Sequence, residues 1–286
     1  MSIVKVIECP RDAMQGIKDW IPSKNKIDYI QSLLSVGFDL IDFGSFVSPR
    51  AVPQMKDTHY VLDNLDLTNS KSKLLSIAAN FRGAKEACSF SKIDYLGYPF
   101  SISENFQMRN TNKTISESIT ELKKIISICD KHDKEIVIYL SMGFGNPYGD
   151  PWNYEIVDKW ISVLKLLGIK IISISDTIGA AKKDDVYEVF SKAIVDYPNI
   201  EFGAHFHTNP GKWYDKIDSA YRAGCLRFDC AIQGFGGCPM AKDELTGNFP
   251  TEKLISYFNS KKVELNINSL NFESAYNFAS KIFIKS

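Results

Sequence analysis

Short apolar and β-branched runs alternate with longer segments of helical periodicity along the chain. The runs predict eight strands, at Val4–Glu8, Leu40–Phe43, Lys73–Ala78, Tyr95–Pro99, Glu135–Leu140, Lys170–Ser175, Ile200–Phe206 and Arg227–Asp229. The clearest helical patterns between them lie at Lys24–Val36, Ile115–Cys129, Trp152–Leu167, Asp185–Tyr197 and Trp213–Ala223. This alternation is typical of proteins that bury a parallel sheet beneath helices.

Eight strand–helix units in 286 residues predict an α/β protein with a single (β/α)8 TIM barrel. We expect one catalytic domain over residues 1–286, with the barrel at about 3–258 and a C-terminal helical extension at about 259–286. A doubly wound open sheet is the alternative. The first strand, however, leads into Glu8-Cys9-Pro10-Arg11 rather than a glycine-rich dinucleotide fingerprint.

The charge, apolar runs and cysteines of the sequence limit the kinds of partner and the cellular location that we expect. Lysine plus arginine and aspartate plus glutamate number 34 each, which argues against a nucleic-acid or anionic membrane partner. No apolar run approaches the length of a membrane span, and no leader pattern opens the sequence. The six cysteines are scattered without a CxxC pair, so we expect reduced thiols and a cytoplasmic protein.

The strongest local signal is His205-Phe206-His207 at the end of the seventh predicted strand. Residues i and i+2 of a strand face the same side, so both imidazoles can converge on one point. In α/β barrels, chemistry collects where strands end and βα-loops begin. A metal clamp is therefore one reading, and a pair of hydrogen-bonded interior histidines is the other.

Asp12 follows the first strand, which barrel closure brings near the seventh through the eighth. Two imidazoles with a carboxylate suit a hard or borderline divalent ion, and the lack of a thiolate cluster favours Mg²⁺ or Mn²⁺ over structural zinc. The ordinary alternative for Asp12 is a turn or helix-capping role.

Three further features have weaker signals. Gly234-Phe235-Gly236-Gly237-Cys238-Pro239 could form a lid over an active site, or simply a flexible loop with an incidental thiol. Asp176 precedes a predicted helix and could simply be a helix-capping residue. Asp42 lies within an apolar strand, where a carboxylate must be paired or hydrogen-bonded.

Several stretches together resemble the 3-hydroxy-3-methylglutaryl-CoA lyases, which belong to a larger group of metal-dependent barrel lyases and synthases. The similarity runs in order from about residue 4 to residue 257. The matching stretches are Pro10-Arg11-Asp12-Ala13-Met14-Gln15, Ser45-Phe46-Val47-Ser48-Pro49-Arg50 with Val52-Pro53-Gln54-Met55, Ser175-Asp176-Thr177-Ile178-Gly179, His205-Phe206-His207, and Gly234 to Pro239 through Thr246-Gly247-Asn248.

The resemblance implies a function and a set of site residues. The reaction would be a retro-Claisen cleavage of 3-hydroxy-3-methylglutaryl-CoA to acetyl-CoA and acetoacetate, with one Mg²⁺ or Mn²⁺ ion and a homodimeric protein. Metal ligands would be Asp12, His205, His207 and Asn248; catalytic residues Arg11, Asp42, Asp176 and Cys238; and substrate-binding residues Arg11, Gln15, Ser48 and Thr177.

The chain also departs from the family pattern. Asp42 stands where glutamate is usual, Ala13 where glycine is usual, and Thr208 where aspartate follows the second histidine. Asn146 occupies a common cysteine position, and residues 240–245 replace a smaller segment that contains glycine. These changes surround the acyl-binding region, so they leave the acyl group open.

Two other functions remain possible from the sequence. The first is a related metal-dependent aldolase or acetyl-CoA-condensing synthase that acts on a different hydroxyacyl or 2-oxo acid substrate. The second is a non-catalytic binding barrel. For coenzyme A, Arg50, Asn105 and Arg109 are candidate loop contacts, although ordinary surface charge explains each of them better.

Overall fold

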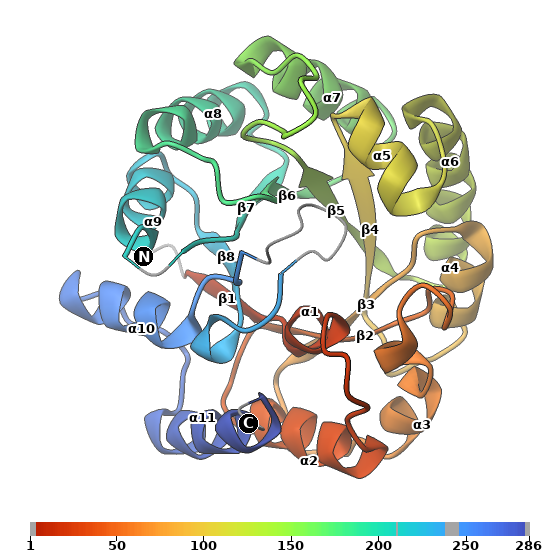
Figure 1. The fold of residues 1–286 in the computed structure, drawn as a ribbon, viewed down its shortest axis with the longest axis vertical. Coiled ribbons are helices and arrows are strands. Elements are labelled where there is room, and N and C mark those ends of the chain that lie inside the picture. The colour runs from red at the N-terminus through yellow and green to blue at the C-terminus, as the bar shows by residue number, and fades with distance from the viewer. Residues whose placement is uncertain (1–3, 210, 238–245, 284–286) are drawn as a thin grey trace.

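The computed structural model describes residues 4–209, 211–237 and 246–283 of the chain. Its centre is a closed barrel of eight parallel strands in the order in which they occur in the sequence (Figure 1). The strands are β1 (Lys5–Glu8), β2 (Leu40–Ser45), β3 (Lys73–Ile77), β4 (Tyr95–Ser101), β5 (Glu135–Ser141), β6 (Ile171–Asp176), β7 (Glu201–Phe206) and β8 (Arg227–Cys230). The predicted (β/α)8 barrel is therefore confirmed.

Each predicted strand is present, and the largest differences lie at the carboxyl ends. There, β2 and β4 run on to Ser45 and Ser101, two residues beyond their predicted ends. Hydroxyl groups at these positions can bond to neighbouring backbone, as Ser45 Oγ does to the carbonyl oxygen of Ile77 at 3.3 Å. Burying a serine at the end of a strand therefore costs little free energy.

Helices surround the barrel as an outer ring (Figure 1). They are α1 (Pro10–Gln15), α2 (Ser23–Leu34), α3 (Thr58–Asp63), α4 (Phe81–Cys88), α5 (Glu104–Thr111), α6 (Ile115–Lys131), α7 (Tyr154–Leu166), α8 (Lys183–Asp196), α9 (Trp213–Arg222), α10 (Thr251–Ser260) and α11 (Ser269–Phe283), with two short 3-10 turns, Pro53–Met55 and Ile232–Gly234. The five segments with a clear helical pattern are all helices. The short α1, α3, α4 and α5 span at most two turns, which is too few for a periodic pattern to emerge.

Two hydrophobic clusters result from the alternation of side chains along the strands. A smaller cluster that includes Ile7, Leu75, Val137 and Ile171 fills the barrel interior. The larger cluster lies between the strands and the helices. The interior cluster fills the middle of the barrel with apolar side chains. The carboxyl ends of the strands, beyond this cluster, can therefore carry polar groups.

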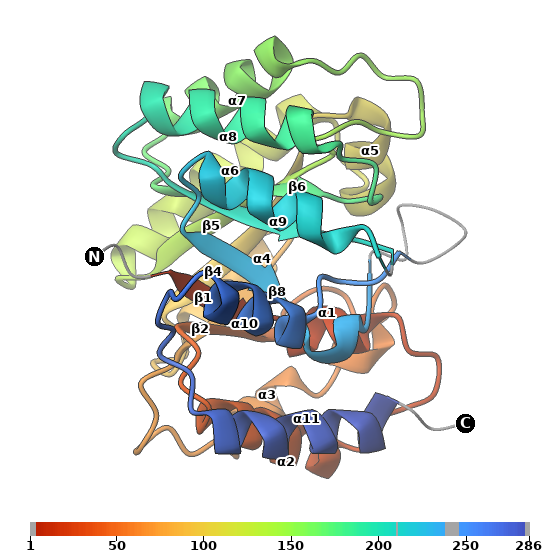
Figure 2. The same cartoon turned by 90° about the vertical axis from the view of Figure 1, so that its left-hand side faces the viewer.

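The last helix, α11, packs beside the barrel against α2, and Figures 1 and 2 both show the two helices side by side. The backbone N–H of Asn268 donates to the carbonyl oxygen of Val36 at 2.8 Å, which ties the start of α11 to the end of α2. A helical segment after the barrel is thus present, and it lies beside α2 in the outer ring rather than over the mouth.

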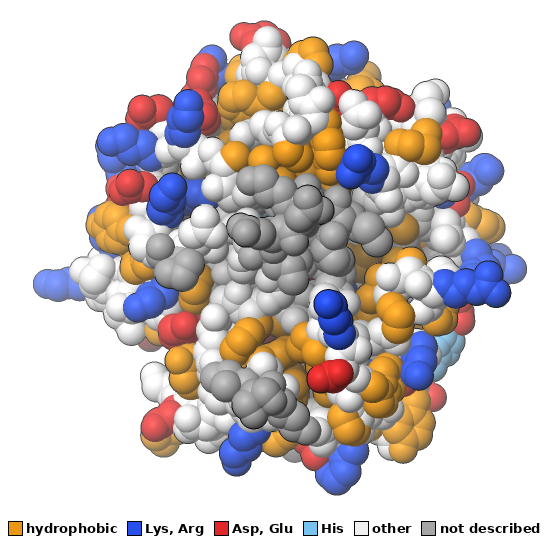
Figure 3. Space-filling view, viewed as in Figure 1, with side chains coloured by type: hydrophobic (Ala, Val, Ile, Leu, Met, Phe, Trp, Pro, Cys, Tyr) orange, Lys and Arg blue, Asp and Glu red, His pale blue; other side chains and the backbone are white. Residues whose placement is uncertain are grey.

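Among the described helices, none is long and apolar enough to cross a membrane. On the face seen in Figure 3, acidic and basic side chains are interspersed around the periphery. Neither sign forms a continuous field on this face. The even balance of charge in the sequence therefore extends to this part of the surface.

Candidate metal centre at the barrel mouth

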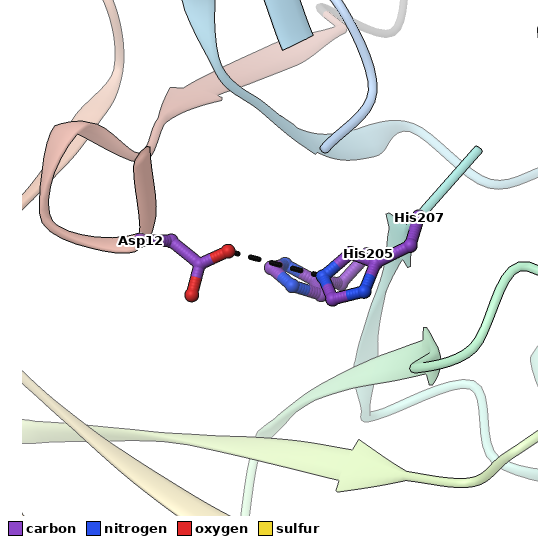
Figure 4. A group of neighbouring side chains, drawn as sticks. All are labelled: Asp12, His205 and His207. Carbon is purple, nitrogen blue, oxygen red and sulfur yellow. Dashed lines mark ion pairs between the residues drawn. The ribbon is translucent and has the colours of Figure 1, made fainter. Parts of the chain in front are cut away.

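Three buried side chains converge at the carboxyl-terminal mouth of the barrel (Figure 4). His205 is the second-last residue of β7 and His207 directly follows that strand, so both rings point to the same side. Asp12 comes from the first turn of α1, which begins two residues after β1 ends. One potential ligand atom from each residue lies within 4.8 Å of the others, a spacing that one cation can span.

The free polar atoms of this cluster are hydrogen-bond acceptors. His207 Nδ1 lies 2.8 Å from the carbonyl oxygen of Thr177, a contact that requires a proton on Nδ1 and leaves Nε2 as a lone pair. That Nε2 and the Asp12 Oδ2 atom are buried, 3.8 Å apart, and without a hydrogen-bond partner among the described residues. Two unpaired acceptors facing each other are stabilised by a cation, so the donor set fits a divalent metal ion.

At Asp12 and His207, electrostatics favour the protonation states that a metal site needs. Burial lowers the pKa of His207, and neighbouring His205 lowers it further, so the ring is held neutral. Burial alone would raise the pKa of Asp12, but Arg11 and the two imidazoles outweigh it and lower this pKa. Asp12 is therefore a carboxylate beside a neutral imidazole.

His205 is oriented by a carboxylate that the sequence analysis missed. The pairing of β7 with β8 places His205 opposite Asp229, and His205 Nδ1 lies 3.2 Å from Asp229 Oδ2. Burial lowers the pKa of His205, but the hydrogen bond and charge of Asp229 outweigh this and raise it. A carboxylate that holds one ring nitrogen and directs the other at the site is a recurring arrangement around metal-binding histidines.

Asn248 lies next to the cluster, as the resemblance implied. Its backbone pairs with that of His207 in an isolated bridge, and its side chain is hydrogen-bonded to Asp12. The Nδ2 atom donates to the carbonyl oxygen of Phe235 at 2.8 Å. A carboxylate only accepts hydrogen bonds, so the bond to Asp12 uses the second N–H of the same amide group. Asn248 therefore presents its amide nitrogen to Asp12, and coordination through its side-chain oxygen would require rotation of the amide group.

Arg11 connects the cluster to Asp42. Its Nε donates to Asp42 Oδ2 at 3.0 Å, and its Nη1 donates to Asp12 Oδ1 and Gln15 Oε1 at 2.9 Å each. Nη2 also donates to Asp42, so four of the five guanidinium N–H groups have partners among the described residues. The aspartate at position 42 thus reaches the arginine despite being shorter than the usual glutamate.

Burial of Asp42 is complete and raises the pKa of its carboxyl group to about 6, although Arg11 acts in the opposite direction. The carboxylate is paired with an arginine, as expected for a charge within an apolar strand. Asp42 does not line the pocket, so its contact with the site passes through Arg11.

A pocket of about 360 Å³ opens above the cluster. Arg11, Gln15, Ser48 and Thr177 line it, so the four predicted substrate-binding residues share its wall with three of the four predicted metal ligands. The fourth, Asn248, does not line the pocket. Tyr139, Ser141 and Lys113 also line the pocket and had not been singled out from the sequence. Tyr139 and Ser141 carried a signal, since both are polar residues near the end of a buried strand.

Asp176 lies close to the site but faces away from the pocket. Its carboxylate accepts hydrogen bonds from the backbone N–H groups of Ala180 and Ala181 at 2.8 and 3.1 Å and from the ammonium group of Lys216. The helix-capping role considered for this residue is not found, because α8 begins only at Lys183 and has no side-chain cap. Asp176 instead closes the turn that follows β6. Any effect of Asp176 on the reaction acts through its neighbours.

The glycine-rich segment after β8 passes directly over α1. A Cβ atom on Gly236 would lie 2.4 Å from the carbonyl oxygen of Asp12, and the backbone φ of Gly236 is +93°. Both facts require glycine, so the expected close backbone approach occurs here. Cys238, the predicted acid/base of this loop, lies outside the described residues, while the five described cysteines are free and buried.

The loop candidates for coenzyme A contacts do not line the pocket. Asn105 Nδ2 donates to Asp150, and the guanidinium of Arg109 stacks on Tyr148 at 5.0 Å. Arg50 is exposed and is not part of the pocket wall. Asn146 is likewise structural, since its side chain bonds to the backbone of residue 150 at both its donor and its acceptor ends.

The fold and the cluster together define a class. A closed parallel barrel with a carboxylate and two imidazoles at its carboxyl-terminal mouth is a (β/α)8-barrel protein with a candidate divalent-metal centre. The family is then given by comparison. The HMGL-like family model matches residues 4–278, and the chain belongs to this family.

Individual relatives agree with this assignment. The chain is 30% identical to the hydroxymethylglutaryl-CoA lyase of Bacillus subtilis over 266 residues, which cover 90% of this chain and 85% of that protein. It is also 30% identical to the mitochondrial hydroxymethylglutaryl-CoA lyase of Arabidopsis thaliana, covering 98% of this chain but only 59% of the plant protein.

Solved structures give the same result. The Bacillus subtilis HMG-CoA lyase superposes with a TM-score of 0.91 at 29% identity, covering 98% of this chain and 93% of that one. An HMG-CoA lyase from Acinetobacter baumannii, solved in complex with coenzyme A and 3-methylmalate, has a TM-score of 0.91 at 26% identity, covering 98% of this chain and 91% of that one.

Proposed function

We propose that this protein is a carbon–carbon lyase that cleaves 3-hydroxy-3-methylglutaryl-CoA to acetyl-CoA and acetoacetate. The observation that carries the proposal is the pair of facing acceptors, Asp12 Oδ2 and His207 Nε2, on the wall of the mouth pocket. Relatives of similar length are named as lyases of this substrate, and the aldolase or synthase alternative is not favoured.

Asp12, His205 and His207 would hold a divalent ion, with Asn248 as a fourth ligand through its side-chain oxygen. Bound there, the ion would supply Lewis-acid polarisation of the substrate oxygens and make the tertiary hydroxyl group more acidic. The donors are nitrogen and oxygen atoms only, and none of the described cysteines belongs to the cluster, which favours Mg²⁺ or Mn²⁺.

In the reaction, a general base takes the proton of the C3 hydroxyl group and the C2–C3 bond breaks. The bonding electron pair moves to C2 as the enolate of acetyl-CoA, and C3 becomes the ketone carbon of acetoacetate. Arg11 is fixed by Asp42 and Gln15 at the edge of the pocket, where its charge would stabilise the negative thioester oxygen of the enolate.

The remaining roles belong to residues that hold the substrate or move protons. Gln15, Ser48 and Thr177 would orient the acyl group from the pocket wall. Asp42 would keep Arg11 in place, and Cys238 would give the final proton to C2. A positioned acid of this kind typically contributes about 10²–10⁴-fold to the rate.

Three finer expectations accompany the function. We expect a homodimer, a cytoplasmic location, and a role in leucine degradation and ketone-body formation. Among the relatives, the Danio rerio lyase is named cytoplasmic and the Arabidopsis thaliana lyase is named mitochondrial. Light scattering after gel filtration of the purified chain would test the dimer.

The function is tested by acetoacetate release from 3-hydroxy-3-methylglutaryl-CoA. We expect turnover with added Mg²⁺ or Mn²⁺, loss of turnover with EDTA, and recovery when the ion is returned. Metal-dependent cleavage of a different hydroxyacyl-CoA or a 2-oxo acid, without cleavage of this thioester, would replace the proposed substrate. No turnover of any of these compounds would contradict the lyase function itself.

A further inference from the structure

A buried lysine lies behind the metal cluster, on the side away from the pocket. Lys216 is the fourth residue of α9, and its side chain is only 5% exposed. Lysine is rarely buried in proteins unless its ammonium group is paired. No sequence pattern indicates its burial, because charged residues on an outer helix normally face the solvent.

The ammonium group has two partners, and both belong to the region that holds His207. Lys216 Nζ forms an ion pair with the carboxylate of Asp176 at 2.5 Å and donates to the backbone carbonyl oxygen of His207 at 3.0 Å. One cation therefore bridges the end of β6 and the residue that follows β7.

His207 is bound to the same region through its other polar groups. Its backbone N–H donates to the carbonyl oxygen of Asp176 at 3.1 Å, and its ring Nδ1 lies 2.8 Å from the carbonyl oxygen of Thr177. Together with the bond from Lys216, these contacts leave Nε2 as the ring atom directed at Asp12. The position of Nε2 thus depends on where residues 176 and 177 are held.

The carboxylate of Asp176 holds those two residues. It accepts the backbone N–H groups of Ala180 and Ala181, and so closes the turn that follows β6. Both groups are buried, so Lys216 neutralises this carboxylate with little help from solvent. Removal of the ammonium group would leave a buried, unpaired charge, and the turn that carries Thr177 would rearrange to relieve it.

We propose that Lys216 is a positioning residue for the metal ligand His207. It fixes the backbone of His207 directly and fixes the ring through Asp176 and the turn that carries Thr177. The inference rests on the proposed metal-dependent function. It predicts an effect on metal affinity that the loss of an ordinary buried ion pair would not produce.

The chain offers a matched control in its other buried lysine pair. Lys26 on α2 has a side chain that is 2% exposed, and its ammonium group lies 2.7 Å from Asp57. It also donates to the backbone oxygen of Gln54. Lys26 thus has the same burial and the same two kinds of partner as Lys216, but neither of its partners bonds to Asp12, His205 or His207.

The experiment is calorimetric titration of the metal-free protein with Mn²⁺, for wild type, Lys216→Met, Lys216→Arg and Lys26→Met, with the melting temperature of each. We expect Lys216→Met to bind Mn²⁺ about 10–100-fold more weakly, as for other residues that orient metal ligands. Lys216→Arg should recover most of the affinity. Lys26→Met should lose thermal stability but retain wild-type affinity.

Two results would overturn the inference. The first is wild-type affinity in Lys216→Met, and the second is an equal loss of affinity in Lys26→Met. If Lys216→Met does not fold, the double variant Lys216→Met/Asp176→Asn, which buries no unpaired charge, carries the same test. There too, wild-type Mn²⁺ affinity would count against the positioning role.

Failure of the lyase function would look different. A wild-type protein that releases no acetoacetate, but whose Mn²⁺ affinity falls in Lys216→Met, would contradict the substrate and support the positioning role. A wild-type protein that cleaves the thioester while Lys216→Met binds Mn²⁺ normally would do the reverse. A wild-type protein that binds no Mn²⁺ would overturn the inference outright.

Discussion

The mouth and the floor of this barrel both bury charged groups, but they arrange them in different ways. The floor here means the end of the barrel where the strands begin. There, Arg227 and Glu201 are ion-paired at 3.2 Å, and Lys5 also contacts Glu201. The unpaired atoms there are of opposite kinds, since Arg227 Nε, a donor, lies 3.9 Å from Asp229 Oδ1, an acceptor. A single water molecule could bridge that gap.

In the metal cluster at the mouth, the two unpaired atoms are of the same kind. Asp12 Oδ2 and His207 Nε2 are both acceptors, and they face each other at 3.8 Å. A water molecule can donate to both, but it neutralises no charge, whereas a divalent ion does so and is surrounded by nitrogen and oxygen ligands. The kind of atom left unpaired therefore separates a site that needs a ligand from an interior that is complete by itself.

The largest effect should come from removing one of the two facing acceptors. His207→Ala takes away a ligand and, with it, several kcal/mol of charge stabilisation, so we expect kcat/KM to fall by about 10³-fold or more. The readout is acetoacetate release at saturating Mn²⁺. Near-normal turnover in this variant would mean that the cation does not bind between Asp12 and His207.

The next effect concerns the charge beside the cluster. Arg11→Met removes the donor that faces the developing enolate, and a loss of about 10²–10³-fold in kcat is expected. Because Arg11 is not a metal ligand, Mn²⁺ affinity should fall far less than kcat. A variant that loses affinity and rate equally would place Arg11 among the groups that build the metal site.

A smaller effect is expected where the mouth meets the floor. Asp229→Asn keeps the shape of the residue but removes the charge that holds His205 Nδ1, and Mn²⁺ affinity should weaken by about 10–100-fold. Ser173, which donates to the same carboxylate at 2.7 Å, offers a milder control as Ser173→Ala. Unchanged affinity in Asp229→Asn would show that His205 is oriented without it.

A buried carboxyl group outside the barrel wall gives a pH test. Burial raises the pKa of Glu8 from 4.5 to about 8, against its hydrogen bonds with Thr251 and Ile232. Between those pH values the folded protein holds a proton that the unfolded chain has lost. The contribution of this proton to the free energy of unfolding is complete below pH 4.5 and is lost as the pH rises toward 8.

Denaturant unfolding of the metal-free protein across that range should therefore show stability falling with pH. Glu8 contributes at most about 1.4 kcal/mol per pH unit to this slope. Glu8→Gln keeps both hydrogen-bonding positions without a titrating proton, so it should flatten this part of the slope. An identical pH profile in the variant would mean that Glu8 is ionised in the folded protein at neutral pH.

The smallest effect is expected at the floor. Lys5 and Glu201 are 45% and 32% exposed, and such pairs are worth about 0–1 kcal/mol. Lys5→Met should lower the free energy of unfolding by no more than that and leave Mn²⁺ affinity unchanged. A floor variant that weakened metal binding would remove the contrast between the two ends of the barrel.

The fold could be predicted almost completely, because a barrel repeats one local pattern eight times. Each buried strand stands out against its amphipathic neighbour, so its position follows from hydrophobicity alone. The short helix α1 could not be predicted in this way, since six residues are too few for a period. That helix nevertheless places Asp12 over the mouth. The residues of the site could therefore be predicted from the sequence more fully than their arrangement in space.

Residues that touch the pocket were found in the sequence more readily than the residues that hold them. His205 and His207 stood out because polar side chains at i and i+2 end an apolar strand, and Arg227 and Asp229 have the same spacing, so that signal was available. Lys216 had no such signal. Its burial depends on how α9 packs over the turn after β6, which local sequence does not encode.

The central claim is that one divalent ion lies between Asp12 and His207. A crystal structure of the protein with Mn²⁺, using anomalous scattering to place the ion, tests it most directly. The account predicts a single peak bonded to Asp12 Oδ2, His205 Nε2 and His207 Nε2, at about 2.0–2.2 Å as for other small divalent ions. A peak elsewhere, or none with the two acceptors still facing each other, would contradict it.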